Sequence, residues 1–273
     1  MSLPERQSEL VETHRAIQNA GLPYVLVGGW AVSAFQTRFT TDIDTVIPAT
    51  ALDDYDSLLV DLGYEKQFEK DVSNHYEGQM VQYAKPVGEN EVKFETLVDA
   101  MGCRQTDAEW SYRYLHEHST VESIAVAENL EGRIPEPALL FAMKLHSGRK
   151  ADIRDLVVIS TRTEFDRIER HLHRGDPVKL DRQIETVLER LRKDAFEDSF
   201  KGVFRQEKLP ADGIDELVSF LSEQRDGIRY DSWRDLARDV PPEWSRDRTD
   251  HSCRQFDRSL GDPDTRRNRR RVA

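Results

Sequence analysis

Asp42 and Asp44 are the two residues of this chain whose type and spacing most directly suggest chemistry. They open residues 42–47, in which polar and apolar residues alternate, as is typical of a strand. Because successive side chains of a strand point to opposite sides, both carboxylates would lie on one face. Neighbouring carboxylates repel each other, and a bound cation removes that repulsion. Since Mg²⁺ takes carboxylate oxygens, the pair predicts a metal site.

Gly28 and Gly29 precede this pair and have the properties of a phosphate-binding turn. They follow the apolar residues 24–27, which predict a buried strand, and precede residues 30–35, which predict a short buried helix. Glycine lets the backbone approach a phosphate closely, and the start of a helix favours negative charge. The alternative is a glycine turn in an α/β domain, with the two aspartates as solvated acids on an edge strand.

The order of strand, glycine pair, helix and Asp-x-Asp strand resembles the nucleotidyltransferase superfamily typified by DNA polymerase β. Within it, Gly28-Gly29-Trp30-Ala31 and Arg38-Phe39-Thr40-Thr41-Asp42-Ile43-Asp44 look like the branch of AbiEii-type toxin transferases and small antibiotic nucleotidyltransferases. The resemblance covers roughly the first 160 residues. It implies transfer of an NMP from ATP or another NTP to an acceptor hydroxyl, with release of pyrophosphate.

The resemblance also implies roles for individual residues. Asp42 and Asp44 would hold Mg²⁺ or Mn²⁺, and a third carboxylate is expected on a strand beside them. Residues 79–84 and 91–98 predict two strands joined by a hairpin turn. In the second of them Glu95 matches the third carboxylate best, and Asp99 is the runner-up. The residues that the resemblance places at the nucleotide in this part of the chain are Gly28, Gly29, Arg38 and Thr40.

A lysine and an aspartate farther along the chain complete the expected site. The proline-flanked start at residues 135–137 predicts a helix, and residues 151–159 predict the next one. Lys144 and the Arg-Asp-Leu sequence around Asp155 are similar to C-terminal motifs of the AbiEii-type transferases. The resemblance implies that Lys144 contacts a phosphate and that Asp155 is a functional aspartate, which would orient Lys144, Arg149 or the acceptor. The alternative is that Asp152 and Asp155 only favour a helix N-terminus.

The fold class expected from these patterns is α+β. Residues 1–130 are expected to form a nucleotidyltransferase catalytic domain with a mixed β-sheet and helices. Residues 131–245 are expected to form an all-helical C-terminal domain, and the polar residues 246–273 a disordered tail. Aromatic and histidine residues alternate over residues 110–118, which predicts a strand or an exposed rim with a packing role.

Composition limits the partners and the compartment. The chain has 273 residues and a formal net charge of −12, which argues against binding nucleic acid over its whole surface but not through a local basic patch. Cys103 and Cys253 are the only cysteines, too few for a disulfide framework or a zinc-binding cysteine set. No apolar run is long enough to span a membrane, and no signal sequence is evident. We therefore expect a cytoplasmic protein without a membrane partner.

The acceptor is left open by the sequence, with three hypotheses. The resemblance implies tRNA or another RNA, with a toxin-like outcome and a cognate antitoxin. The acidic charge suits a small hydroxylated acceptor such as a cationic antibiotic. A non-catalytic nucleotide-binding partner protein is the third possibility, and the presence of Asp42, Asp44 and Glu95 together argues against it.

Overall fold

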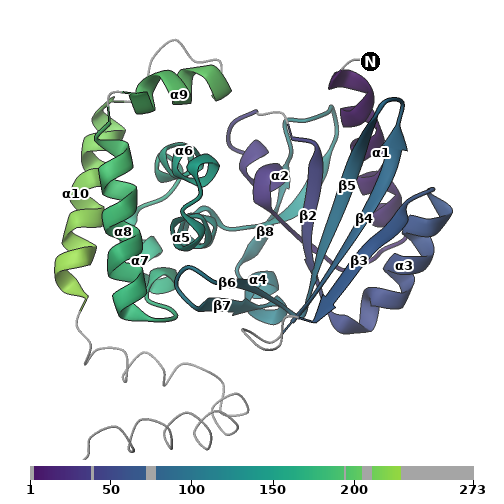
Figure 1. Cartoon of the computed structure of the whole chain (residues 1–273), viewed down its shortest axis with the longest axis horizontal. Helices are drawn as coiled ribbons and strands as arrows, with labels where there is room; N and C mark the ends of the chain where they lie inside the picture. The colour runs from purple at the N-terminus through teal and green to yellow at the C-terminus, as the bar shows by residue number, and fades with distance from the viewer. Residues whose placement is uncertain (1–2, 38–39, 72–77, 194, 205–210, 229–273) are drawn as a thin grey trace, which may run out of the picture. The chain divides into compact units, whose positions relative to one another are not determined.

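The computed structural model describes residues 3–37, 40–71, 78–193, 195–204 and 211–228 (Figure 1). Arg38 and the whole of residues 246–273 lie outside these ranges, so the expectations for them stay predictions. Within the described ranges, no helix has the length and apolar character needed to cross a membrane.

A five-stranded mixed sheet forms the centre of the fold, with the strand order β1-β2-β5-β4-β3. Strands β2 and β5 are parallel, and the other neighbouring pairs are antiparallel. Gly88 has φ +65° in the two-residue turn between β4 and β5, a conformation that suits glycine at the first turn position. The strands are β1 (Val25–Val27), β2 (Asp42–Ile47), β3 (Glu65–Asp71), β4 (Gln79–Val87) and β5 (Asn90–Val98).

One face of this sheet is covered by helices α1 (Leu3–Asn19) and α3 (Leu52–Asp61) (Figure 1). Tyr55 of α3 packs against Phe94 of β5, with their ring centroids 6.1 Å apart. Lys85 of β4 forms an ion pair of 2.6 Å with Glu9 of α1. These contacts bury Ile43 and Phe94, whose side chains alternate with Asp42, Asp44 and Glu95 along β2 and β5. The carboxylates therefore lie on the opposite face.

That opposite face packs against helix α5 (Pro137–Ser147) and the hairpin of β6 (Ala100–Cys103) and β7 (Ala108–Ser111). Val27 and Val46 of the sheet share a buried cluster with Leu139 and Met143 of α5 and with Trp110 of β7. Every side chain of α5 from Ala138 to Ser147 is buried. Helix α5 is thus held against the sheet by apolar packing.

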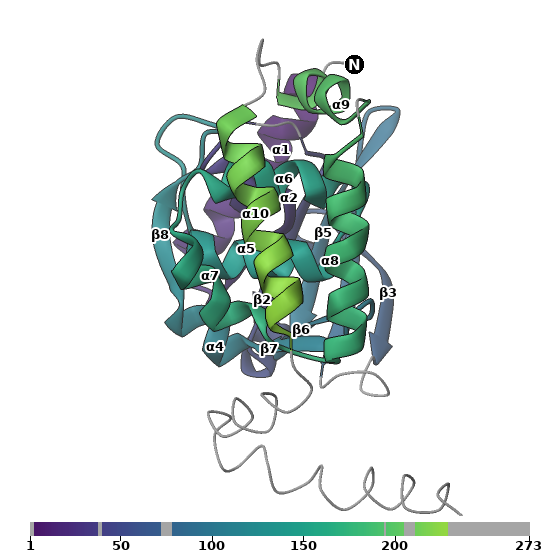
Figure 2. The same cartoon turned by 90° about the vertical axis from the view of Figure 1, so that its left-hand side faces the viewer.

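Further helices lie outside α5. Helices α8 and α10 run side by side there (Figure 2), and Arg225 of α10 donates to Asp181 of α8 at 2.8 Å. The remaining elements are α2 (Gly28–Ser33), the 3-10 turn η1 (Ala49–Ala51), α4 (Tyr112–Glu117), β8 (Ser119–Ser123), β9 (Glu131–Pro135), α6 (Lys150–Ser160), α7 (Phe165–Leu172), α8 (Pro177–Leu191), α9 (Ala195–Phe204) and α10 (Ala211–Gly227).

The expected α+β class is confirmed by this mixed sheet and its helices. The strand predicted over residues 110–118 is wrong beyond Ser111, because the chain turns into helix α4 there. The Ser111 side chain accepts a hydrogen bond from the Tyr114 amide and so caps the helix start. The boundary expected between residues 130 and 131 stays a prediction.

Candidate active site

Asp44 and Glu95 face each other across the parallel strands β2 and β5. The register pairs Asp44 with Glu95 and, on the other side, with Val27 of β1. Asp42 precedes Asp44 by two residues on the same face, and all three carboxylates are half-buried. Asp99 lies elsewhere: its backbone has φ +63°, and its carboxylate accepts a hydrogen bond of 2.7 Å from the Ala49 amide. The structure therefore brings together Asp42, Asp44 and Glu95.

The three carboxylates repel one another, and a bound cation would relieve this repulsion. Burial, together with the neighbouring charges of Asp42 and Glu95, raises the pKa of Asp44 to about 7. Lys144 and Arg149 act in the opposite direction without cancelling the effect. A set of carboxylate oxygens is the donor chemistry that hard divalent ions prefer. These residues therefore fit Mg²⁺ or Mn²⁺.

Gly28 lies directly beneath one of these carboxylates. Its backbone has φ +61°, and a Cβ atom added there would lie 1.8 Å from Asp44 Oδ2. Gly29 follows it and is buried within α2, a helix of only six residues. Glycine at position 28 thus allows the backbone to turn in a left-handed conformation after β1. It also leaves space for the Asp44 carboxylate.

Two neutral side chains hold the outer carboxylates. The Thr40 hydroxyl donates to Asp42 Oδ1, and the Gln82 amide donates to Glu95 Oε1. Gln82 lies on β4 directly opposite Glu95 in the antiparallel register. Sequence reasoning placed Thr40 at the nucleotide and missed Gln82. The two-residue turn of the hairpin sets the register of β4 and β5. The pairing of Gln82 with Glu95 follows from the position of this turn in the sequence.

Lys144 lies at the end of α5 between two aspartates of α6. Its Nζ atom is 2.8 Å from Asp152 Oδ1 and 2.9 Å from Asp155 Oδ2, and all three side chains are buried. Burial alone would lower the pKa of Lys144, but Asp155 and Asp152 overcome this and raise it. The expected link between Lys144 and Asp155 is present, and Asp152 is a second partner that the sequence suggested only as a helix-start residue.

Asp152 is the central member of this buried group. It accepts hydrogen bonds from Ser147 Oγ at 2.7 Å and from the Arg149 amide at 3.2 Å. Burial acts to raise the pKa of Asp152, whereas the Lys144 charge and these donors lower it. The backbone of Gly148 has a left-handed conformation, with φ +52°. It reverses the chain between α5 and α6 and so brings Lys144 and Asp152 together. The side chain of Arg149 is largely exposed beside them.

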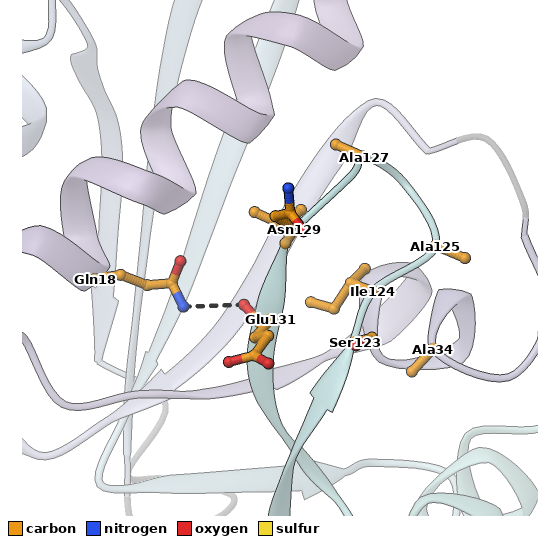
Figure 3. A pocket seen from close by; sticks show the side chains of 9 residues that line it. Gln18, Ala34, Ser123, Ile124, Ala125, Ala127, Asn129 and Glu131 are labelled. Carbon is orange, nitrogen blue, oxygen red and sulfur yellow. Dashed lines mark hydrogen bonds between the residues drawn. The ribbon is translucent and has the colours of Figure 1, made fainter.

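A hollow on another part of the fold is separate from this site. It has a volume of about 690 Å³ and is lined by the β8–β9 loop and the ends of α1 and α2 (Figure 3). The Gln18 amide donates to the Glu131 carbonyl at its edge, and Ile124 and Ala34 line its apolar side (Figure 3). None of the carboxylates of β2 and β5 lines it, so we assign it no role in the chemistry.

Comparison with solved structures finds nucleotidyltransferases among the similar chains. The antibiotic-resistance factor ANT(2'')-Ia is 15% identical over 63% of this chain and 91% of that chain, with a TM-score of 0.46. The lincosamide antibiotic adenylyltransferase LnuA, solved with lincomycin bound, is 15% identical over 57% of this chain and 97% of that chain, with a TM-score of 0.41.

An antigenic nucleotidyltransferase-like protein from Paracoccidioides brasiliensis is also similar. It is 15% identical over 76% of this chain and 99% of that chain, with a TM-score of 0.45. No protein-family model matches the sequence, and no curated protein matches it either. Similarity at this level carries no argument about substrate, so the functional argument depends on the residues of the site.

Proposed function

We propose that this protein is a nucleotidyltransferase that moves an NMP from an NTP to an acceptor hydroxyl and releases pyrophosphate. The observation that carries this proposal is the pairing of Asp44 with Glu95 across β2 and β5, with Asp42 on the same face. The three carboxylates form a group that can bind a metal ion. The glycine turn beside them has a left-handed backbone and lets a phosphate approach the main chain closely. In this proposal residues 1–130 form the catalytic domain, and residues 131–245 supply Lys144 and Asp155.

Asp42, Asp44 and Glu95 would hold Mg²⁺ or Mn²⁺. Divalent ions at such a site stabilise the attacking and leaving oxygens of an in-line displacement. The side chains of Thr40 and Gln82 keep Asp42 and Glu95 oriented through the hydrogen bonds described above. Glu95 would also accept a hydrogen bond from the acceptor hydroxyl.

The triphosphate would lie between the glycine turn and Lys144. The backbone amides of Gly28 and Gly29 would donate to phosphate oxygens, and Arg38, which lies outside the described residues, would contribute charge. Lys144 would offset the negative charge that grows on the leaving pyrophosphate. Asp155 and Asp152 fix its ammonium group in place, so they are positioning residues.

The acceptor belongs to one of two classes. A small, hydroxylated and cationic molecule is favoured by the net charge of −12, because an acidic surface attracts cations and repels a polyanion. The resemblance to AbiEii-type toxins favours tRNA, with a cognate antitoxin as a further partner. We place the reaction in the cytoplasm, where NTPs are available to both kinds of enzyme.

The test is pyrophosphate release with each of the four NTPs in the presence of Mg²⁺ or Mn²⁺. Each reaction is run with total tRNA, with a panel of small hydroxylated cations, or with neither. Transfer of label to RNA would establish the toxin-like reaction, and transfer to a small acceptor would establish the antibiotic-type reaction. Binding of a nucleotide without turnover under every condition would refute the enzymatic proposal and indicate a nucleotide-binding partner protein.

A further inference from the structure

A second group of possible metal ligands lies at the other end of α5. His118 follows α4, Glu136 immediately precedes α5, and His171 belongs to α7. Their ligand atoms all lie within 4.8 Å of one another. Glu136 is eight residues before Lys144, or about 12 Å along the helix axis. The group is therefore separate from the carboxylates of β2 and β5.

The two imidazoles converge on a single carboxylate oxygen. His118 Nδ1 is 3.2 Å from Glu136 Oε1, and His171 Nε2 is 3.1 Å from the same oxygen. Ligand atoms bound tetrahedrally to zinc at about 2.0–2.1 Å are about 3.3 Å apart. The two nitrogen–oxygen distances are close to that value, and the two nitrogens lie within 4.8 Å of each other, so side-chain movements would be enough to admit an ion.

Neighbouring side chains orient these ligands from outside. The Tyr114 hydroxyl is 2.7 Å from His171 Nδ1, the ring nitrogen that faces away from Glu136. Arg167 donates to Glu136 Oε2 at 2.8 Å and leaves Oε1 directed at the histidines. The Tyr114 ring also packs against His118, with their centroids 4.4 Å apart. A second hydrogen bond on a metal-binding histidine or carboxylate is the usual way in which proteins fix such ligands.

The hydrogen bonds of the group are compatible with a bound metal ion as well. His171 is almost fully buried. A neutral imidazole has the lone pair that coordination needs. If Nε2 binds a metal, Nδ1 carries the proton and donates to the Tyr114 hydroxyl, so the same pair of atoms stays hydrogen-bonded.

We propose that His118 Nδ1, Glu136 and His171 Nε2 bind one Zn²⁺ ion, with water as the fourth ligand. Imidazole nitrogens select Zn²⁺ over Mg²⁺, which takes oxygen ligands, so the two metal sites would differ in the ions they hold. The zinc ion would join the segment after α4 to the start of α5 and to α7. It would therefore stabilise the packing of these elements.

The test uses Co²⁺ as a spectroscopic substitute for zinc. The full-length protein is titrated with Co²⁺ in a large excess of Mg²⁺, which is added to compete for the carboxylates of β2 and β5. We expect the visible absorption bands of Co²⁺ in a low-symmetry site with nitrogen and oxygen ligands. The absorbance should saturate at one equivalent of Co²⁺, and addition of Zn²⁺ should abolish it. His118→Ala is expected to weaken Co²⁺ binding by more than about 10-fold, and Glu136→Gln to do the same. The melting curve of each variant without metal establishes that it is folded.

His116→Ala is the matched control, because His116 is an exposed histidine of α4 two residues before His118. It should bind Co²⁺ as the wild type does. Asp44→Asn should also keep the cobalt spectrum, which separates this site from the proposed transfer reaction. If the wild type shows no cobalt absorption, or if His118→Ala retains it, the group is a hydrogen-bonded cluster only and the proposal is overturned.

Discussion

Gly28 and Asp44 are in such close contact that the residue at position 28 controls the position of a proposed metal ligand. The Asp44 carboxylate occupies the space in which any side chain at position 28 would begin, since an added Cβ would lie 1.8 Å from Oδ2. The turn after β1 is therefore part of the carboxylate site as well as a means of reversing the chain.

Gly28→Ala is expected to reduce nucleotidyl transfer by at least about 100-fold, because a displaced carboxylate loses its place beside Glu95. Gly21→Ala is the control. Gly21 has φ +66°, close to the +61° of Gly28, but an added Cβ there would meet no atom within 4 Å. Both variants bear similar backbone strain of about 1 kcal/mol. Equal loss of activity in the two variants would contradict the contact with Asp44.

Replacement of Asp42 or Asp44 by Ala is expected to abolish transfer and to leave the fold intact. The side chains are half-buried and lie on the face that gathers carboxylates, so their removal relieves repulsion. Activity is measured as pyrophosphate release, and folding by circular dichroism and the melting temperature. Full activity in either variant would refute the proposed mechanism.

The contribution of Asp44 to the stability of the metal-free protein should fall as the pH rises from about 4 to about 7. The folded state raises the pKa of Asp44 from 3.8 to about 7, so folding favours the protonated form and this contribution is lost on ionisation. Mg²⁺ binds the ionised carboxylates, so its addition should raise the melting temperature more at pH 8 than at pH 5.5.

Asp44→Asn tests this assignment, since it should remove this pH-dependent contribution and reduce the Mg²⁺ effect. Each kcal/mol corresponds to about 2–4 °C in a chain of this size. A melting temperature that responds to Mg²⁺ equally at both pH values would be inconsistent with ionisation of Asp44 as the cause.

Lys144→Met is expected to destabilise the protein by about 3–5 kcal/mol, because it removes the buried ammonium group that contacts both Asp152 and Asp155. Asp152→Asn should cost less, since Lys144 keeps Asp155. The lowered pKa of Asp152 also predicts a pH effect. Its contribution is present above the unfolded value near 3.9 and is lost as the pH falls through the lower folded value. Urea unfolding of both variants between pH 2.5 and 6 measures these effects, and equal stability of both would contradict the ranking.

Gln82→Ala is expected to lower kcat by about 10-fold, because Glu95 would lose the donor that orients it. KM for the NTP should change little, since Gln82 contacts a carboxylate outside the proposed triphosphate site. Gln79→Ala is the control on the same strand, because the Gln79 amide bonds to the exposed Glu69. A matching effect of both variants would show that loss of a β4 amide, rather than orientation of Glu95, is responsible.

Local patterns predicted the parts of this site that lie on strands. The alternation in residues 42–47 placed Asp42 and Asp44 on one face, and the hairpin pattern placed Glu95 on a strand beside residues 79–84. These properties depend on a two-residue period that the sequence displays directly. The position of Glu95 beside Asp44 was expected only from the family resemblance, and the register of β2 and β5 shows this pairing.

Contacts between helices could not be predicted in the same way. The two partners of Lys144 depend on the left-handed Gly148 and on the packing of α5 against α6, which no local period records. His118, Glu136 and His171 come from three separate elements, and the alternation around His118 suggested a strand where Ser111 starts a helix. Tertiary packing decides which of these polar groups meet.

Helix α5 has a proposed zinc ligand before its first residue and the proposed phosphate contact in its last turn. An α-helix turns by about 100° and advances about 1.5 Å per residue. A single insertion or deletion between Glu136 and Lys144 would therefore rotate one group away from its partners, whereas substitutions of similar size would leave both in place. Evolutionary divergence of this helix is thus expected to exchange one buried side chain for another of similar volume while its residue count stays constant.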